Sequence, residues 1–385
     1  KYGWEVRGDY NNAYDEWIFI EGAWLNKYNE KYYLQYAVPG TAQKSYADGV
    51  YVADSPLGPY TVAAHNPFAY KPEGFACGAG HGSTFQDKHG NWWHVGTVPV
   101  SVKHKFERRL ALYPVFWDAD DLLYADTRFG DYPMIIPDRK ISSVEELFPG
   151  WMLLSYRKAV EASSSMNDHP PENLCDEEIR TYWSATSGSD REWILMDLGA
   201  LCDIHAVQLN FAESETWARG RKPGRKHRYT VEVSNDRKKW RMLIDKSGKD
   251  DDCSHDYTQL QNKISARYIR VNNIEVPDGN FAVSGLRIFG LGTGAKPDAV
   301  VKFQAERDET DRRIVHLKWS PANGATGYQV RFGIAKDKLY QNYMLYGDHE
   351  LSIRILNTDL EYDFSIEAFN ENGVTPTALL TTTRP

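Results

Sequence analysis

The sequence has little of what marks several common classes of protein. Its 385 residues contain no run of about 18 or more apolar residues, so no membrane-spanning segment is expected. Positive charge is in deficit, because 45 Lys and Arg face 53 Asp and Glu and the net charge is −8. A surface that binds phosphates should be basic, which argues against nucleic acid as a general partner. A neutral ligand fits this balance better.

Cysteine is also scarce. The four cysteines, Cys77, Cys175, Cys202 and Cys253, show no metal-ligand spacing such as a Cys-x-x-Cys pair. We expect them to be buried thiols, and a Cys175–Cys202 or Cys202–Cys253 bridge is the less favoured alternative. Cysteine therefore does not decide whether the protein works in an oxidising or a reducing compartment.

Helical periodicity is missing from the second half of the chain, where short alternating segments are broken by polar turns. These segments are typical of antiparallel strands. We expect an all-β protein in which β-sandwiches follow a first, aromatic-rich region. The clearest strand signals are residues 193–199, 204–209, 229–234, 267–271, 314–319 and 328–332.

Aromatic residues, by contrast, are abundant, with 24 Tyr and 12 Trp. Most of them are expected to pack within sheets, because aromatic side chains favour pleated surfaces. A minority are candidates for platforms that stack against sugar rings. The aromatic content therefore fits a β-protein with a carbohydrate ligand.

An internal repeat is the most informative feature. Residues 21–34 match residues 81–94 at a constant offset of 60, which makes Glu21 and His81 equivalent. Repeats of this kind, with short aromatic strands and Gly or Asn turns, are typical of propeller blades. Glu21 and His81 are then expected to open innermost strands and to face a shared axis, where propellers hold ligands. Residues 51–59 and 123–131 extend the match.

The chain is too long for one ordinary core, and it divides into three segments. We expect propeller blades over residues 1–149, an antiparallel sandwich over 150–292 and a second sandwich over 296–385. A Gly-rich break followed by Pro297 separates the two sandwiches. Tyr362 is a candidate for the tyrosine corner of an immunoglobulin-like fold.

With these motifs in view, the first segment resembles the C-terminal part of the five-bladed propeller of glycoside hydrolase family 43. The family's Glu-Gly-Pro-Trp motif reads here as residues 21–24, with Ala23 in place of proline, and its Gly-His-Gly-Ser motif is intact at residues 80–83. The resemblance implies that Glu21 is the general acid. It also implies substrate contacts from Trp24, His81 and Arg108, with Arg109 as the alternative if the register shifts by one.

The resemblance further implies an inverting mechanism. In such a mechanism one carboxylic acid protonates the departing oxygen while a second carboxylate activates water. The family's base and its pKa-modulating Asp come from earlier blades. Asp9 and Asp15 lie too close in sequence to Glu21 to replace them. Because the chain starts at Lys1 without an initiator Met or a signal sequence, we expect a segment upstream of it, and we expect this piece alone not to turn over substrate.

The second segment resembles a discoidin (coagulation factor 5/8 type C) domain, similar to carbohydrate-binding module family 32. This resemblance implies a calcium loop around Asp176, Glu178 and Thr181, although Gly285 stands where the family has a glutamate. A further calcium ion, bound at the propeller axis through His81, directly or by way of water, is also implied. The third segment resembles fibronectin type III, through the residues Trp319, Tyr328 and Tyr362.

Sugar-binding candidates in the second segment are Trp217 and Arg219, and a rigid spacer packed on the propeller is the alternative role of this segment. The basic run 219–228 is expected to be a solvated loop, with binding of an acidic glycan as the alternative. The leading hypothesis is an exo-acting glycosidase on polysaccharide side chains, an α-L-arabinofuranosidase or a β-xylosidase, with β-galactosidase activity as an alternative within the family. A non-catalytic glycan-binding or adhesion protein is the alternative from a different class. Because polymeric substrates cannot enter a cytoplasm, we expect a periplasmic, cell-surface or secreted protein.

Overall fold

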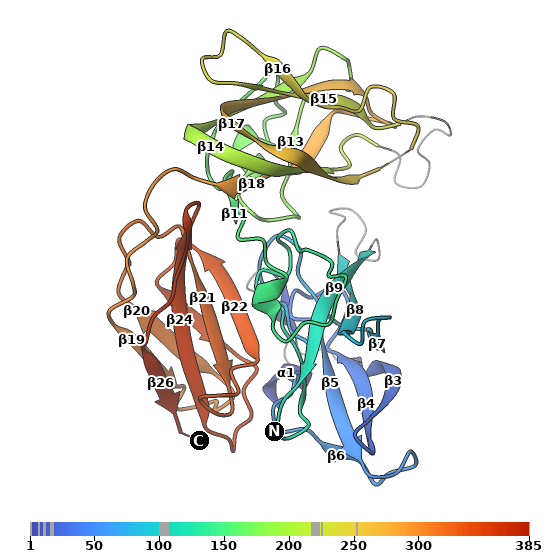
Figure 1. Cartoon of the computed structure of the whole chain (residues 1–385), viewed down its shortest axis with the longest axis vertical. Coiled ribbons are helices and arrows are strands. Elements are labelled where there is room, and N and C mark those ends of the chain that lie inside the picture. Colours follow the sequence, from blue (N-terminus) through green and yellow to red (C-terminus); the bar gives the residue numbers. More distant parts are fainter. Residues whose placement is uncertain are drawn as a thin grey trace.

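The computed structural model describes residues 2–6, 8–10, 13–15, 19–99, 108–216, 224, 226–251 and 253–384. The fold is almost entirely β, as expected, and its strands form three modules. The first and third modules lie side by side, and the second lies across one end of both (Figure 1). In the described part of the chain, no helix is long and apolar enough to cross a membrane.

The first module contains two equivalent four-stranded antiparallel sheets, in the orders β3-β4-β5-β6 and β10-β9-β8-β7. A tight turn with positive φ at Asn29 and Glu30 joins the first two strands. A shared core with Tyr33, Val50 and Phe68 lies between the sheets. The strands are β3 (Glu21–Tyr28), β4 (Lys31–Val38), β5 (Ala47–Ala53), β6 (Thr61–Val62), β7 (Ser83–Gln86), β8 (Trp92–Pro99), β9 (Arg108–Trp117) and β10 (Leu123–Ala125).

A short N-terminal segment precedes these sheets. It contains the helix α1 (Gly3–Val6) and the strands β1 (Gly8–Tyr10) and β2 (Ala13–Asp15), which form a hairpin. The indole of Trp4 is buried, and it belongs to a cluster that joins residues of the first module to the core of the third. The segment therefore links two modules.

The second module is an eight-stranded antiparallel assembly. Its two longest strands pair along their length with register shifts, which lets each strand bend around one large core. Its strands are β11 (Met152–Leu153), β12 (Ala159–Ala162), β13 (Trp183–Ser184), β14 (Trp193–Phe211), β15 (Arg228–Ser234), β16 (Arg241–Asp245), β17 (His255–Glu275) and β18 (Ala282–Leu291), with 3-10 turns η1 (Val144–Glu146) before it and η2 (Pro171–Leu174) within it.

The third module is a sandwich of a three-stranded and a five-stranded sheet. The hydroxyl of Tyr362 accepts a hydrogen bond from the backbone N–H of Asn357 at 3.2 Å, the arrangement expected of a tyrosine corner. The fibronectin type III assignment itself stays a prediction. The strands are β19 (Phe303–Arg307), β20 (Val315–Trp319), β21 (Gly327–Gly333), β22 (Gln341–Tyr346), β23 (Glu350–Ile353), β24 (Tyr362–Asn370), β25 (Gly373–Thr375) and β26 (Leu380–Thr383).

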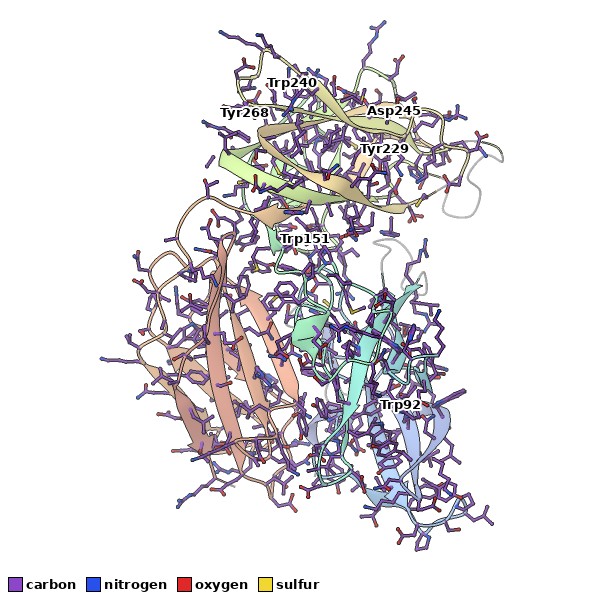
Figure 2. The ribbon with its side chains drawn as sticks, in the orientation of Figure 1. Trp92, Trp151, Tyr229, Trp240, Asp245 and Tyr268 are labelled. Carbon is purple, nitrogen blue, oxygen red and sulfur yellow. The ribbon has the colours of Figure 1, made fainter. Side chains whose placement is uncertain are left out.

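Side chains fill all three modules, and the aromatic residues serve mainly as packing groups (Figure 2). Trp92 contacts Trp117 edge-on within the first module, and Tyr229 is buried in the second. The ring of Trp240 is covered by the guanidinium of Arg270, 4.3 Å from its centre. All four cysteines are free, and three of them are buried, so the alternative of a disulfide bridge is wrong.

Candidate functional site

The structure brings Glu21 and His81 together. Glu21 opens β3, and His81 lies just before β7, so the two equivalent positions of the repeat meet where the sheets adjoin. The Nδ1 atom of His81 is 3.5 Å from the Oε1 atom of Glu21. Both side chains remain about half exposed, at 46% and 44%. The pair is therefore accessible to a ligand.

A hydrogen bond from Tyr46 and an irregularity of the backbone at Gly22 fix the position of Glu21. The hydroxyl of Tyr46 donates a hydrogen bond to its Oε1 at 3.0 Å. The pairing of β3 with β4 shifts register between Glu21 and Trp24, and Gly22 has a positive φ of 68° there. A β-carbon at Gly22 would lie 3.0 Å from the ring of His81, so glycine is required for this close approach.

A buried carboxylate supports the turn that carries His81. Asp48 lies in β5 and is fully buried, and its two oxygens accept the backbone N–H groups of His81 and Gly82 at 2.9 Å each. Burial raises the pKa of Asp48 to about 7, against the effect of these two donors, which lower it. His81 itself has a positive φ of 54°, a conformation that the carboxylate helps to hold.

A second histidine, His94, lies close to Asp48 and is fully buried. The Nε2 atom of His94 is 2.8 Å from the carbonyl of Ala79 and 3.5 Å from Asp48. Burial lowers the pKa of His94 to about 4, so its ring is neutral near pH 7. Its Nδ1 lies 3.3 Å from the hydroxyl of Thr84, which in turn donates to Gln35. Because Thr84 lies on β7 and Gln35 on β4, these hydrogen bonds connect the two sheets next to Asp48.

The indole of Trp24 is partly exposed, and its N–H donates to the carbonyl of Thr84 at 2.9 Å. Because Trp24 lies on β3 and Thr84 on β7, this bond holds the two innermost strands next to each other. The ring therefore has a fixed position at the junction of the two sheets.

The two arginine candidates separate clearly. Arg108 donates to the hydroxyl of Thr41 at 3.0 Å, and its charge acts on Tyr46. Arg109 instead reaches the second module, where it donates to the hydroxyl of Ser254 at 3.0 Å. The geometry therefore favours Arg108 over Arg109 as the site arginine.

Metal sites fit the described residues poorly. In the part of the chain that the structure describes, no group of three or more His, Cys, Asp or Glu is arranged to hold a metal ion. Within the described residues, the imidazole of His81 contacts the carboxylate of Glu21, which also accepts the hydroxyl of Tyr46, and these few oxygen atoms do not make a site for an ion that takes six to eight oxygen ligands. The axial calcium ion implied by the resemblance is therefore not supported by these side chains.

The expected calcium loop in the second module is also engaged otherwise. The carboxylate of Asp176 accepts the N–H of Glu178 and the hydroxyl of Thr181, at 2.9 and 2.5 Å. The carboxylate of Glu178 points away, to Lys44 of the first module. The hydroxyl of Thr181 also donates to the backbone carbonyl of Glu178 at 3.0 Å, so the oxygen atoms of this loop are engaged with one another and the carboxylate of Glu178 is not among them.

For the predicted sugar-binding residues of the second module, the structure offers little evidence. Trp217 and Arg219 lie outside the described residues, as does most of the basic run 219–228. From this run, Arg228 pairs with Asp250 and Glu275. Arg228 is the first residue of β15, and the interpretation of the run as a solvated loop stays a prediction.

Sequence reasoning missed Tyr46, Asp48 and His94. Only an indirect signal was available for Asp48. The Gly-His-Gly-Ser motif implies an irregular turn with free N–H groups, and such groups need an acceptor when they are buried. Which residue supplies the acceptor depends on the pairing of sheets, which local sequence does not give.

Comparisons with known proteins agree with this architecture. Residues 5–123 match the family model described as "Glycosyl hydrolases family 43", and residues 159–284 match the model described as "F5/8 type C domain". The first module thus contains a segment similar to family 43 glycosyl hydrolases, and the second contains one similar to F5/8 type C, or discoidin, domains. No curated protein matches the sequence.

Several solved structures are similar to parts of this chain. A chain described as "Glycoside hydrolase" is 17% identical with a TM-score of 0.38, over 72% of this chain and 62% of that one. This chain therefore spans 62% of that relative's length. A chitosan-binding module from a Paenibacillus sp. IK-5 chitosanase/glucanase is 22% identical, with a TM-score of 0.30 over 36% and 99%. A family 32 module from C. perfringens NanJ, in complex with galactose, is 15% identical, with a TM-score of 0.30 over 36% and 98%.

Proposed function

We propose that this chain is part of an inverting, exo-acting glycosidase that removes α-L-arabinofuranosyl or β-xylosyl units from polysaccharide side chains. The family 43 match supports hydrolysis of glycosidic bonds in general. The observation that carries the proposal is the placement of Glu21, half exposed, beside His81 and hydrogen-bonded by Tyr46. The exo mode of action and the identity of the sugar rest on the family resemblance. The identity of the sugar is tested first.

The contacts of Glu21 indicate how it acts as a general acid. Tyr46 donates to Oε1, and the same oxygen faces His81, so Oε2 is left to carry the proton. Burial and the bond to Glu21 raise the pKa of Tyr46 well above its ordinary value, so the phenol stays a donor. The proton passes from Oε2 to the glycosidic oxygen as the bond from that oxygen to the anomeric carbon breaks.

Water completes the reaction from the opposite face of the sugar. It forms a new bond to the anomeric carbon and gives its proton to a second carboxylate, roughly 6.5–9.5 Å from the acid. We propose that this base comes from a blade other than the two four-stranded sheets of the first module, and that residues 1–385 alone lack activity. Arg108 and the ring of Trp24 contribute substrate contacts in this proposal, because the charge of Arg108 acts on Tyr46, the partner of Glu21, and Trp24 lies on the same strand as Glu21.

The test compares Glu21→Gln with the unaltered full-length protein, including any residues before Lys1, on arabinan, xylan side chains and aryl glycosides. Loss of a general acid lowers kcat by about 10²–10⁴-fold on polysaccharide, whose leaving group needs a proton. The loss is much smaller on a 2,4-dinitrophenyl glycoside, whose leaving group does not. Glu30→Gln, in the exposed turn after β3, is the matched control. Undiminished activity of Glu21→Gln on polysaccharide rejects the assignment.

We further propose that the F5/8 type C domain binds carbohydrate and that the protein is exported to the periplasm, the cell surface or the medium. The family match of residues 159–284 supports the binding role. Calorimetry of the whole chain against oligosaccharides of arabinose, xylose, galactose and glucosamine tests it. No heat across this panel reduces the module to a spacer, whereas binding without any hydrolysis by the full-length protein favours the adhesion alternative.

A further inference from the structure

The expected calcium loop of the second module, residues 176–181, faces the first module. The ammonium of Lys44 lies 2.6 Å from the carboxylate of Glu178, and both side chains are largely buried, at 10% and 23% exposed. Arg180 donates to the backbone carbonyl of Ala42 at 3.3 Å. A cationic side chain of the neighbouring module is therefore the partner of this loop's acidic group.

Gly285 stands at the position where discoidin domains have a glutamate. The space in front of its α-carbon is filled by a neighbouring side chain. A β-carbon at Gly285 would lie 2.6 Å from the ring of Phe75, which belongs to the first module. The guanidinium of Arg287, two residues further along β18, lies 4.8 Å from the centre of the same ring. Phe75 thus occupies the position that a longer side chain at residue 285 requires.

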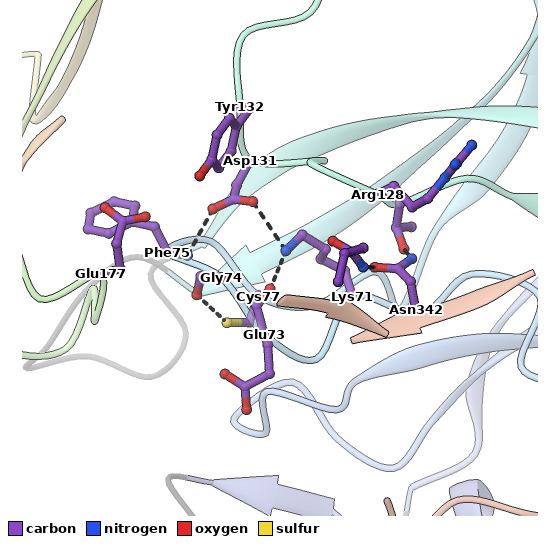
Figure 3. Close-up of polar contacts among 12 residues, drawn as sticks. Lys71, Glu73, Gly74, Phe75, Cys77, Arg128, Asp131, Tyr132, Glu177 and Asn342 are labelled. Carbon is purple, nitrogen blue, oxygen red and sulfur yellow. Dashed lines mark hydrogen bonds and ion pairs between the residues drawn. The ribbon is translucent and has the colours of Figure 1, made fainter. Parts of the chain in front are cut away.

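A buried ion network closes the contact. Arg287 makes two bonds to the carboxylate of Glu177, at 3.0 and 2.9 Å, and reaches the carboxylate of Asp131 at 3.1 Å. Lys71 contacts the other oxygen of Asp131 at 3.2 Å, and Phe75 donates its N–H to the same carboxylate (Figure 3). All four charged side chains are at most 4% exposed.

Two cations and two anions are balanced in this network, so no net charge is buried. Removing charges from water is costly, and the attraction between them repays this only when the geometry is well defined. Lys71 and Asp131 belong to the first module and Glu177 and Arg287 to the second. Each module therefore holds one ion pair, and the contact of Arg287 with Asp131 joins the two pairs. This contact favours the orientation of the two modules in which all four charges meet.

We propose that residues 176–181 of the F5/8 type C domain are a docking surface for the first module and not a calcium site. The partner is fixed: the segments around Lys44 and Phe75 of the same chain. The contact holds the second module in one orientation relative to Glu21, so a glycan bound by that module is presented at a constant angle. The presentation of a glycan rests on the proposed carbohydrate binding by the F5/8 type C domain, whereas the docking contact itself does not depend on the glycosidase assignment.

The calcium part is tested on the whole chain by thermal unfolding in CaCl₂ and in EDTA, with Asp176→Asn as the matched variant. The midpoint is expected to be the same in both buffers. A calcium-dependent rise that Asp176→Asn abolishes overturns the proposal. A rise that persists in Asp176→Asn lies elsewhere in the chain and agrees with a calcium-free loop.

The docking part is tested by charge exchange. Lys44→Glu and Glu178→Lys each place like charges together, so each is expected to lower the midpoint by about 2–4 °C. The double variant restores the pair and recovers at least half of the loss. Exchange of Lys158 and Glu371, a pair between the second and third modules, is the control at another junction. Glu178→Gln gives a milder change in the same direction if the exchanges fold poorly.

Orientation is read by the distance between spin labels at Leu57→Cys and Met242→Cys, two exposed positions on the first and second modules, with Cys253→Ser to remove the least buried native thiol. A single narrow distribution is expected for the parent and the double exchange, and a broadened one for each single exchange. A broad distribution in the parent overturns the proposal. So do unchanged width and unchanged midpoint in both single exchanges.

Discussion

The carboxylate of Asp48 accepts the backbone N–H of His81 at 2.9 Å, and this bond joins the two sheets of the first module. Tyr46, two residues earlier, holds Glu21 through its hydroxyl. One short stretch of chain at the start of β5 therefore positions both members of the candidate catalytic pair. The acid and the imidazole are fixed relative to each other because they share this support.

Asp48→Ala is expected to destabilise the protein by about 2 kcal/mol. The substitution leaves the buried N–H groups of His81 and Gly82 without acceptors, and part of that loss is offset because a buried carboxylate is removed. Urea unfolding of the whole chain measures the change. Asp54→Ala, at an exposed position directly after β5, is the control. Its free energy of unfolding is expected to stay within about 0.5 kcal/mol of that of the unaltered chain. Equal stability of both variants contradicts the supporting role of Asp48.

Stability is expected to depend on pH through two opposing groups. The folded-state pKa of Asp48, about 7, exceeds its ordinary value of 3.8, so its contribution is present below pH 4 and is lost as the pH rises to 7. The folded-state pKa of His94, about 4, is below its ordinary 6.5, so its contribution is present above pH 6.5 and is lost as the pH falls to 4. Between pH 4 and 6.5 the two slopes largely cancel.

Asp48→Asn separates these slopes. The variant keeps the contribution of His94 and loses that of Asp48, so its stability should rise between pH 4 and 6.5, by up to about 3 kcal/mol. Urea titrations at pH 4.5, 5.5 and 6.5 measure the slope, and the unaltered chain is the reference. A variant whose stability is flat over this range shows that His94 does not titrate as its burial indicates.

Arg108 and Arg109 are expected to differ in effect. In the full-length protein, Arg108→Ala should lower kcat/KM by about 10–100-fold, the value of one charge-assisted hydrogen bond to substrate. Arg109→Ala should leave kcat/KM within about twofold, because Arg109 contacts Ser254 of the second module. Steady-state kinetics on one aryl glycoside decide between them. The reverse order of effects means that the register is shifted by one.

Gly285→Ala is expected to destabilise the contact between the first two modules by about 1–3 kcal/mol, because the new methyl group overlaps the ring of Phe75. Adding Phe75→Ala removes the overlap, so the double variant should lose less than the sum of the single ones. Gly248→Ala, where a β-carbon meets open space, is the control for denaturant unfolding. Additive losses in the double variant refute the overlap.

The sequence predicts the strands and the repeat well because both are local. The offset of 60 residues places Glu21 and His81 at equivalent strand starts, and the structure confirms two sheets of the same order. Alternation also succeeds in the third module, where β20 buries every second residue. Tyr362 bonds only five residues back, so its partner too lies within reach of local reasoning.

The contacts between modules could not be predicted in this way. Arg287 meets Asp131, 156 residues away, and a glycine at residue 285 gives no sign that Phe75 fills its space. The choice between Arg108 and Arg109 depends on how β9 pairs with β8, since neighbouring residues of a strand point to opposite faces. Contacts between residues far apart in the sequence determine how the modules meet and which arginine faces the site. Composition and motif spacing do not reveal such contacts.

Trp4 limits how freely evolution can exchange these modules. Its indole is fully enclosed, and a β-carbon at Gly49 of β5 would lie 2.1 Å from the ring. The same cluster includes Val315, Leu317 and Tyr362 of the third module. Replacing the third module with an unrelated one would leave the indole of Trp4 against a surface that does not fit it. The three modules are therefore expected to be inherited together and not exchanged individually.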